Sequence, residues 1–168
     1  MNSVALFDQV CQKASKHTTY GYSTSFSLGI RSLDKRFHAP IHAIYGFVRF
    51  ADEIVDTFHG YDKQDLLRRF REDTHRSIAE GISLNPILHS FQRVVNTFHI
   101  EAELYDTFLD SMAMDLRDTA HDQQSYETYI LGSAEVVGLM CLRVFCEGDH
   151  ALYAKLKPAA MKLGAAFQ

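Results

Sequence analysis

The residues best suited to chemistry lie close together between positions 45 and 56. Arg49, Asp52 and Asp56 follow one another at spacings of three and four residues. At about 100° per residue, a helix would bring them and Tyr45 onto one stripe roughly 60° wide. Apolar residues occupy most of the remaining surface of this segment, which is typical of a buried helix. The pattern therefore predicts two carboxylates and a guanidinium on a helix largely closed to water.

Two carboxylates beside one arginine leave negative charge that burial makes costly. An unpaired buried ion is strongly destabilising, and Glu53, at the edge of the stripe, would add a third acid. A Mg²⁺ ion would offset this charge, because proteins hold Mg²⁺ through one or two carboxylates together with water and substrate phosphates. Arg49 then suits a phosphate oxygen through its planar guanidinium. The alternative is a plain buried ion-pair network of Arg49 with Asp52 and Asp56, and the spacing leaves both interpretations open.

The composition predicts the elements that must position these residues. The chain has 168 residues, of which 46% are hydrophobic and 23% charged, with only 3 Pro and 9 Gly. Helical periodicity without strand-like alternation predicts one all-α domain over 1–168. Pro40 fits the first turn of the central helix, and Pro158 is expected to kink the last one. The expected helices span 4–16, 38–58, 63–80, 86–98, 101–117, 125–146 and 149–168.

Charge and composition exclude several function classes. A formal charge of −4 without a basic run gives no footprint for nucleic acid. No stretch is long and apolar enough to span a membrane, and the first residues do not resemble a secretory signal. Three cysteines without metal-ligand spacing fit free thiols in the cytoplasm. The nine histidines are scattered, which argues against a zinc site.

Three further segments could support the central helix. Tyr22–Ser27 offers several hydroxyls that could contact a phosphate or simply cap a helix. Asp115 could add a carboxylate to the site, or pair with Arg117 or Arg143. Small residues in the helix 125–146 permit either close helix packing or the wall of an apolar cavity, with Tyr129 beside it.

Five motifs follow one another along nearly the whole chain. They are Ser23-x-Ser25-Phe26-Ser27; Ala43-Ile44-Tyr45-Gly46-Phe47-Val48-Arg49-x-x-Asp52-Glu53-Ile54-Val55-Asp56; Met112-x-Met114-Asp115-Leu116; Tyr129-x-x-Gly132-Ser133-Ala134-Glu135-Val136-Val137-Gly138-Leu139-Met140; and Leu163-Gly164-x-Ala166-Phe167-Gln168. In this order they resemble the phytoene/squalene synthase family, and most of all its bacterial phytoene synthases.

The resemblance implies an all-α, isoprenoid synthase-type helical bundle that condenses two prenyl diphosphates head to head and releases pyrophosphate. The expected reaction joins two geranylgeranyl diphosphates to phytoene by way of prephytoene diphosphate. Mg²⁺, or Mn²⁺ in its place, is the expected cofactor, and NADPH is not expected. Because the product is a lipid, a cytoplasmic enzyme peripheral to the inner face of the membrane is a further expectation.

The resemblance also implies roles for individual residues. Where some relatives have His and Lys, this chain has Tyr22 and Thr24. The implied roles are substrate diphosphate binding by Tyr22, Ser23, Ser25 and Arg49; metal binding by Asp52 and Asp56, with Asp115 as an additional acid; catalysis by Tyr45 and Tyr129; and a cavity wall of Phe26, Ser133, Val137 and Gly138.

One feature of the family pattern is missing. In the family, Leu-Gly-x-x-x-Gln is followed by a second Asp-rich motif, whereas this sequence ends at Gln168. We therefore expect a bundle that is incomplete at the C-terminus, and little or no synthase activity from these 168 residues alone.

Other functions remain open at this point. Within the family, a dehydrosqualene or squalene synthase that uses farnesyl diphosphate is the alternative. Outside it, a non-catalytic helical binding protein could keep Arg49, Asp52 and Asp56 as an ion-paired core. Head-to-tail prenyltransferases and terpene cyclases are disfavoured, because residues 52–56 do not form their D-D-x-x-D pattern.

Overall fold

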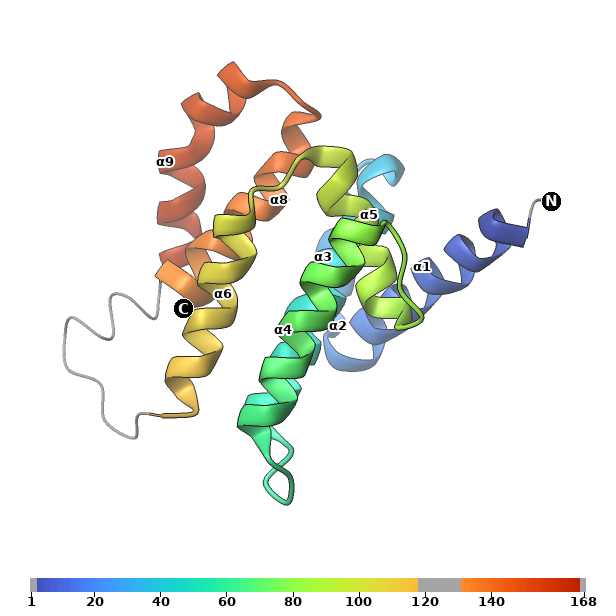
Figure 1. Cartoon of the computed structure of the whole chain (residues 1–168). Helices are drawn as coiled ribbons and strands as arrows, with labels where there is room; N and C mark the ends of the chain where they lie inside the picture. The colour runs from blue at the N-terminus through green and yellow to red at the C-terminus, as the bar shows by residue number, and fades with distance from the viewer. Residues whose placement is uncertain (1–2, 118–130, 167–168) are drawn as a thin grey trace.

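The computed structural model describes residues 3–117 and 131–166, and every regular element in these ranges is a helix (Figure 1). The predicted all-α class is thus confirmed. Tyr129, Phe167 and Gln168 lie outside the described residues. The elements are α1 (Ser3–Tyr22), α2 (Thr24–Ser32), α3 (Lys35–Asp56), α4 (Lys63–Glu80), α5 (Pro86–Phe98), α6 (Ala102–Asp115), the π-helix η1 (Leu131–Glu135), α8 (Val136–Cys146) and α9 (His150–Ala166).

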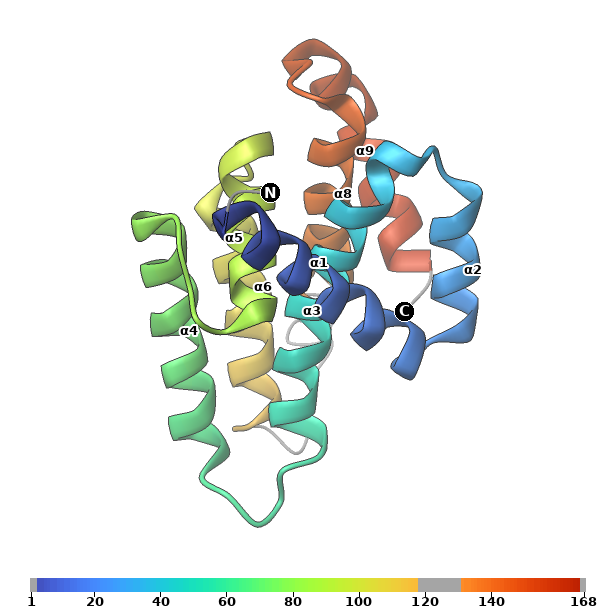
Figure 2. The same cartoon turned by 90° about the vertical axis from the view of Figure 1, so that its right-hand side faces the viewer.

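The helix with the chemically interesting stripe, α3, lies at the centre of the bundle. It contacts α1, α2, α4, α5, α6 and α8. Figure 2 shows α1 crossing α3, with α2 on one side and α4 and α5 on the other. A helix packed on so many sides needs apolar residues over most of its surface, which explains the composition of α3.

An aromatic cluster joins four helices at the core. Phe47 of α3 stacks on Phe91 of α5, with ring centroids 3.9 Å apart. The same ring lies 5.6 Å from Phe70 of α4 and 5.6 Å from Phe108 of α6. Phe47, Phe91 and Phe108 are fully buried. This cluster sets the orientation of α3 against its neighbours. It therefore also sets the orientation of the opposite face of α3, which carries Tyr45, Arg49 and Asp52.

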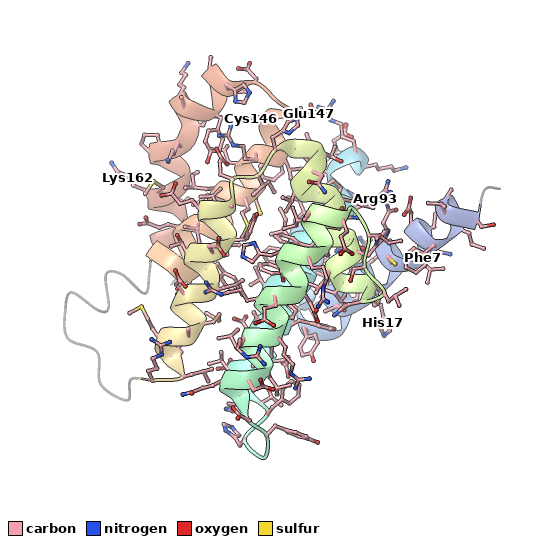
Figure 3. The ribbon with its side chains drawn as sticks, viewed as in Figure 1. Phe7, His17, Arg93, Cys146, Glu147 and Lys162 are labelled. Carbon is pink, nitrogen blue, oxygen red and sulfur yellow. The ribbon has the colours of Figure 1, made fainter. Side chains whose placement is uncertain are left out.

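A charged contact ties α1 to the bundle. The Asp8 carboxylate accepts hydrogen bonds from His89 Nε2 at 2.8 Å and from Arg93 at 2.5 Å, both on α5. The other ring nitrogen of His89 accepts the backbone N–H of Ser83, so His89 has both nitrogens engaged. The ring of Phe7 packs on His89 with centroids 4.7 Å apart. Phe7 and Arg93, which mark the two helices, are labelled in Figure 3.

Several expected helix boundaries are wrong. The first helix extends to Tyr22 rather than to residue 16. The central helix begins at Lys35 and not near Pro40, because Asp34 caps it by accepting the Arg36 N–H. Pro40 then lies inside the helix, where it removes the bond to the carbonyl of Arg36, an exposed residue near the helix start. The segment expected as one helix over 125–146 contains a π-helical turn at Leu131–Glu135.

Two other features bear on the expectations. None of the described helices is long and apolar enough to cross a membrane. The cysteines are free thiols, with Cys11 and Cys146 buried and Cys141 half-buried, and burial raises the pKa of Cys141 to about 12.

Candidate functional site

The end of α1, the start of α2 and the second half of α3 meet to form the candidate site. Ser23 lies between α1 and α2 and caps α2, since its Oγ accepts the Phe26 N–H at 3.1 Å. The Ser25 hydroxyl lies 3.4 Å from that of Ser23. The polar stretch predicted to contact phosphate or to cap a helix therefore does cap one, and it holds two hydroxyls beside α3.

Arg49 is held in place from two sides. Its guanidinium forms an ion pair and hydrogen bond with Glu53, one turn further along α3. It also lies over the ring of Tyr22, 4.4 Å from the centroid. The Nε atom of Arg49 is buried and has no hydrogen-bond partner. A buried donor without an acceptor is costly, so this side of the guanidinium is suited to an anionic oxygen.

The partner of Arg49 differs from the expected one. The ion-pair alternative placed Arg49 with Asp52 and Asp56, whereas the structure pairs it with Glu53. The hydrogen bond from Arg49 lowers the pKa of Glu53, with a further contribution from Thr57. The signal that could have identified this pair was its i,i+4 spacing, which is the geometry of helical ion pairs.

Tyr45 lies between the hydroxyls and the charges. Its ring packs against Phe26 with centroids 4.9 Å apart, and its hydroxyl hydrogen-bonds the Ser23 side chain. Burial raises the pKa of Tyr45. The phenol therefore stays protonated at neutral pH and can donate a hydrogen bond, while the two rings offer π-faces to a cation.

The carboxylates share one region but are not equally buried. Asp52 is half-buried, and its pKa rises to about 6, mainly through desolvation and then through the negative charges of Asp56, Glu53 and Asp115. Arg49 opposes this rise without cancelling it. Asp56 is exposed, which corrects the prediction that both acids are buried. The physical reason is that α3 ends at Asp56, where the stripe leaves the bundle.

Asp115 approaches the same region from another helix. It is the last residue of α6, and its charge contributes to the raised pKa of Asp52. Arg143, which the sequence offered as a partner of Asp115, instead forms its ion pair with Glu101 and also contacts His150. The charges of three acids from two helices, Glu53, Asp56 and Asp115, thus help to raise the pKa of Asp52.

The small residues after position 130 serve mainly in packing. A Cβ on Gly132 would lie 2.6 Å from Ser111 Cβ and 3.0 Å from the Thr107 carbonyl, so η1 approaches α6 closely. Gly138 faces α9 at ordinary contact distance, and Val137 packs against the core. The hydroxyl of Ser133 is buried without a partner. Close packing is therefore what the structure shows at Gly132, and the predicted cavity wall stays a prediction.

The donor set fits a hard cation shared with a substrate. No group of three His, Cys, Asp or Glu side chains that could hold a metal ion gathers among residues 3–117 and 131–166. Mg²⁺ does not need such a group, since water and phosphate oxygens complete its octahedron. Asp52 and Asp56 lie one turn apart, and the pKa of Asp52 is raised first by desolvation and then by the negative charges of Asp56, Glu53 and Asp115. The predicted metal ligands are therefore compatible with this ion.

Comparison with known proteins agrees with the fold and the motifs. The squalene/phytoene synthase family model matches residues 19–168. The chain belongs to this family. A presqualene diphosphate synthase of Rhodopseudomonas palustris is 26% identical over 132 residues, which is 77% of this chain and 47% of that protein. The presqualene diphosphate synthase of Zymomonas mobilis is 30% identical over 128 residues, or 73% of this chain and 43% of that protein.

Solved structures of similar proteins show the same fold. A dehydrosqualene synthase crystallised with a ligand superposes with a TM-score of 0.79 at 22% identity, covering 95% of this chain and 54% of that one. The squalene synthase HpnC from Alicyclobacillus acidocaldarius gives a TM-score of 0.79 at 19% identity, covering 92% of this chain and 58% of that one. The isoprenoid synthase-type bundle predicted from the sequence is thus confirmed. The chain spans slightly under half the length of the curated relatives it matches.

Proposed function

We propose that this chain supplies residues of a site for head-to-head condensation of two prenyl diphosphates. The observation that carries the proposal is the buried, unpartnered Nε of Arg49, set beside hydroxyls and carboxylates from separate helices. A diphosphate is the group that these neighbours share as a ligand, because it accepts from arginine and hydroxyls and shares a divalent cation with carboxylates.

The side chains divide the work of the first step. Arg49 and the hydroxyls of Ser23 and Tyr45 bind diphosphate oxygens and orient the carbon–oxygen bond that breaks. Asp52 and Asp56 would hold Mg²⁺, whose positive charge would favour departure of the anion. The bonding electron pair leaves with pyrophosphate, and an allylic cation remains.

The aromatic side chains act on that cation. The ring faces of Phe26 and Tyr45 stabilise positive charge, and their bulk keeps water from adding to it. The double bond of the second chain then donates its electron pair, and loss of one proton closes a cyclopropane ring. Burial raises the pKa of Tyr45, which favours the protonated phenol as a hydrogen-bond donor to the diphosphate. We assign the proton lost on ring closure to the released pyrophosphate, an anion that is formed beside the cation.

The substrate chain length is the finer part of the proposal. The curated relatives are named presqualene diphosphate synthases, which favours farnesyl diphosphate and a cyclopropyl diphosphate product. The resemblance of the motifs to bacterial phytoene synthases favours the phytoene-type reaction with geranylgeranyl diphosphate. Because the first step is the same in both, incubation of the full-length protein with each labelled diphosphate separates the two reactions by their products.

Binding tests the shared part of the proposal. We expect the chain to bind farnesyl thiodiphosphate, which ionises very slowly, more tightly with Mg²⁺ than with EDTA. The double variant Asp52→Asn/Asp56→Asn should lose the Mg²⁺-dependent part of the binding. The matched control Asp106→Asn/Asp110→Asn removes two acids one turn apart on α6. Equal Mg²⁺ dependence in both variants would show that the metal assignment is wrong.

A further inference from the structure

A second concave region, away from the candidate site, is lined by basic residues. A cleft of about 260 Å³ lies between α1 and the first half of α3. Lys13 and Lys16 line it from α1, and Lys35, His38 and His42 line it from α3. None of its lining residues is acidic, although the whole chain carries a formal charge of −4.

No carboxylate among the described residues forms an ion pair with Lys13, Lys16 or Lys35 that would offset the positive charge of these three lysines. The ammonium of Lys16 lies over the ring of Tyr20, 5.5 Å from the centroid, at the edge of the cleft. Like charges gathered around a hollow repel one another unless an anion lies between them.

The two histidines have defined hydrogen bonds. His38 Nε2 donates to the Leu33 carbonyl at 2.9 Å. The Thr19 hydroxyl donates to the Ser15 carbonyl, so in its 2.9 Å contact with His42 Nδ1 the threonine oxygen accepts and Nδ1 carries the proton. Neutral His42 thus keeps an unprotonated Nε2. Burial, followed by the charges of Lys16 and His38, lowers its pKa to about 4.

We propose that this cleft binds a phosphate-bearing anion, either free pyrophosphate or the headgroup of an anionic lipid. Lysine ammonium groups bind phosphate as mobile point charges and require no fixed plane. Such an anion would offset the repulsion among Lys13, Lys16 and Lys35. It would also weaken the effect of Lys16 on His42. The site is independent of the catalytic proposal, since none of its lining residues belongs to the Arg49 region.

The imidazole NMR signals of His42 and His38 give a local readout in the intact chain. Titration with inorganic pyrophosphate in EDTA, where Mg²⁺-dependent binding elsewhere is suppressed, should shift these signals saturably. The pKa of His42 should rise in the bound state, because the anion opposes Lys16. Phosphatidylcholine vesicles with and without phosphatidic acid form the second arm. Shifts with pyrophosphate identify a free anion, and shifts only with phosphatidic acid identify a lipid headgroup.

Lysine variants distinguish binding in this cleft from nonspecific electrostatic attraction of anions to the protein surface. The triple variant Lys13→Gln/Lys16→Gln/Lys35→Gln should bind about tenfold more weakly than the unmodified chain. Lys155→Gln/Lys157→Gln/Lys162→Gln is the control, since it removes the same charge from exposed positions of α9, where Lys162 points away from the bundle (Figure 3). Absence of any histidine shift in the unmodified chain, or equal binding by the two triple variants, would overturn the proposal.

Discussion

Arg49 has its guanidinium held in position before any ligand binds. Glu53 fixes one edge of the group, and the Tyr22 ring lies 4.4 Å from it. Lysine would keep the charge, but it would lose both the planar fork and the stacking. We therefore expect Arg49→Lys to weaken Mg²⁺-dependent binding of farnesyl thiodiphosphate by about tenfold or more, measured by calorimetry.

Arg68→Lys is the matched control for this prediction. Arg68 pairs with Glu72 at the same i,i+4 spacing, but on the exposed face of α4. Its replacement should leave binding unchanged, because a solvated pair contributes little. Equal losses in the two variants would mean that Arg49 does not contact the diphosphate.

Asp52 makes the folded chain sensitive to pH. Its pKa rises to about 6 in the folded chain, from 3.8 for an unperturbed aspartate. The folded state therefore binds the proton more tightly than the unfolded state, and this group reduces stability as the pH rises from about 4 to 6. Asp52→Asn removes the effect, and should raise the free energy of unfolding at pH 7 by about 1–2 kcal/mol after allowance for partial solvation.

Urea unfolding at pH 4.5 and at pH 7 measures this contribution. The variant should lose less stability than the unmodified chain between the two pH values. Glu80→Gln, on an exposed acid at the end of α4, should follow the unmodified chain. We expect Asp52→Asn to be more stable than the unmodified chain and yet to have lost a metal ligand. Binding sites often lower the stability of the free protein, because they keep charged groups in place for a ligand.

At the scale of elements, the sequence predicted helix types and faces better than helix ends. The i,i+3 and i,i+4 pattern correctly placed Tyr45, Arg49 and Asp52 on one face of α3. The start of α3 was missed because Pro40 favours a first turn in isolation, whereas the cap at Asp34 decides where the helix begins. The exposure of Asp56 depends on how far α3 extends beyond its neighbours, which periodicity cannot show.

The π-helical turn η1 and the interaction of Asp115 with Asp52 could not be predicted from the sequence, because both depend on how the helices pack. Leu131–Glu135 has the composition of an ordinary helix, and the close approach of Gly132 to α6 arises only on packing. The effect of Asp115 on Asp52 joins residues on separate helices. Such contacts depend on tertiary geometry, so single-sequence patterns can suggest them without deciding between alternatives.

Two glycines in neighbouring elements give opposite predictions. Gly132→Ala places a Cβ 2.6 Å from Ser111 Cβ, which forces η1 and α6 apart, and should cost about 1–3 kcal/mol of stability. Gly138→Ala meets only the Ala160 carbonyl at 3.5 Å, and should stabilise α8 by up to about 1 kcal/mol through helix propensity. Urea unfolding of both variants measures these changes. If Gly138→Ala is destabilised while Gly132→Ala is not, the packing described here is wrong.

At the scale of the whole molecule, α3 serves the core with one face and the candidate site with another. Its contacts with six other helices mean that a change in the core displaces the site. Asp52→Asn and Phe47→Ala should therefore affect binding by different routes. The first leaves the fold intact while it removes a ligand, whereas the second loosens the element that positions every candidate residue from 45 to 56.

Phe47→Ala would open a cavity where four helices meet. Phe47 is fully buried and lies within 5.6 Å of the rings of Phe70, Phe91 and Phe108. Such truncations cost about 3–5 kcal/mol, a large part of the 5–15 kcal/mol that stabilises a typical domain. We expect a lower urea midpoint and a parallel loss of farnesyl thiodiphosphate binding. Tyr61→Ala, at a side chain that is 72% exposed, should change neither. Retention of full binding in a clearly destabilised Phe47→Ala variant would show that the site does not depend on the aromatic core.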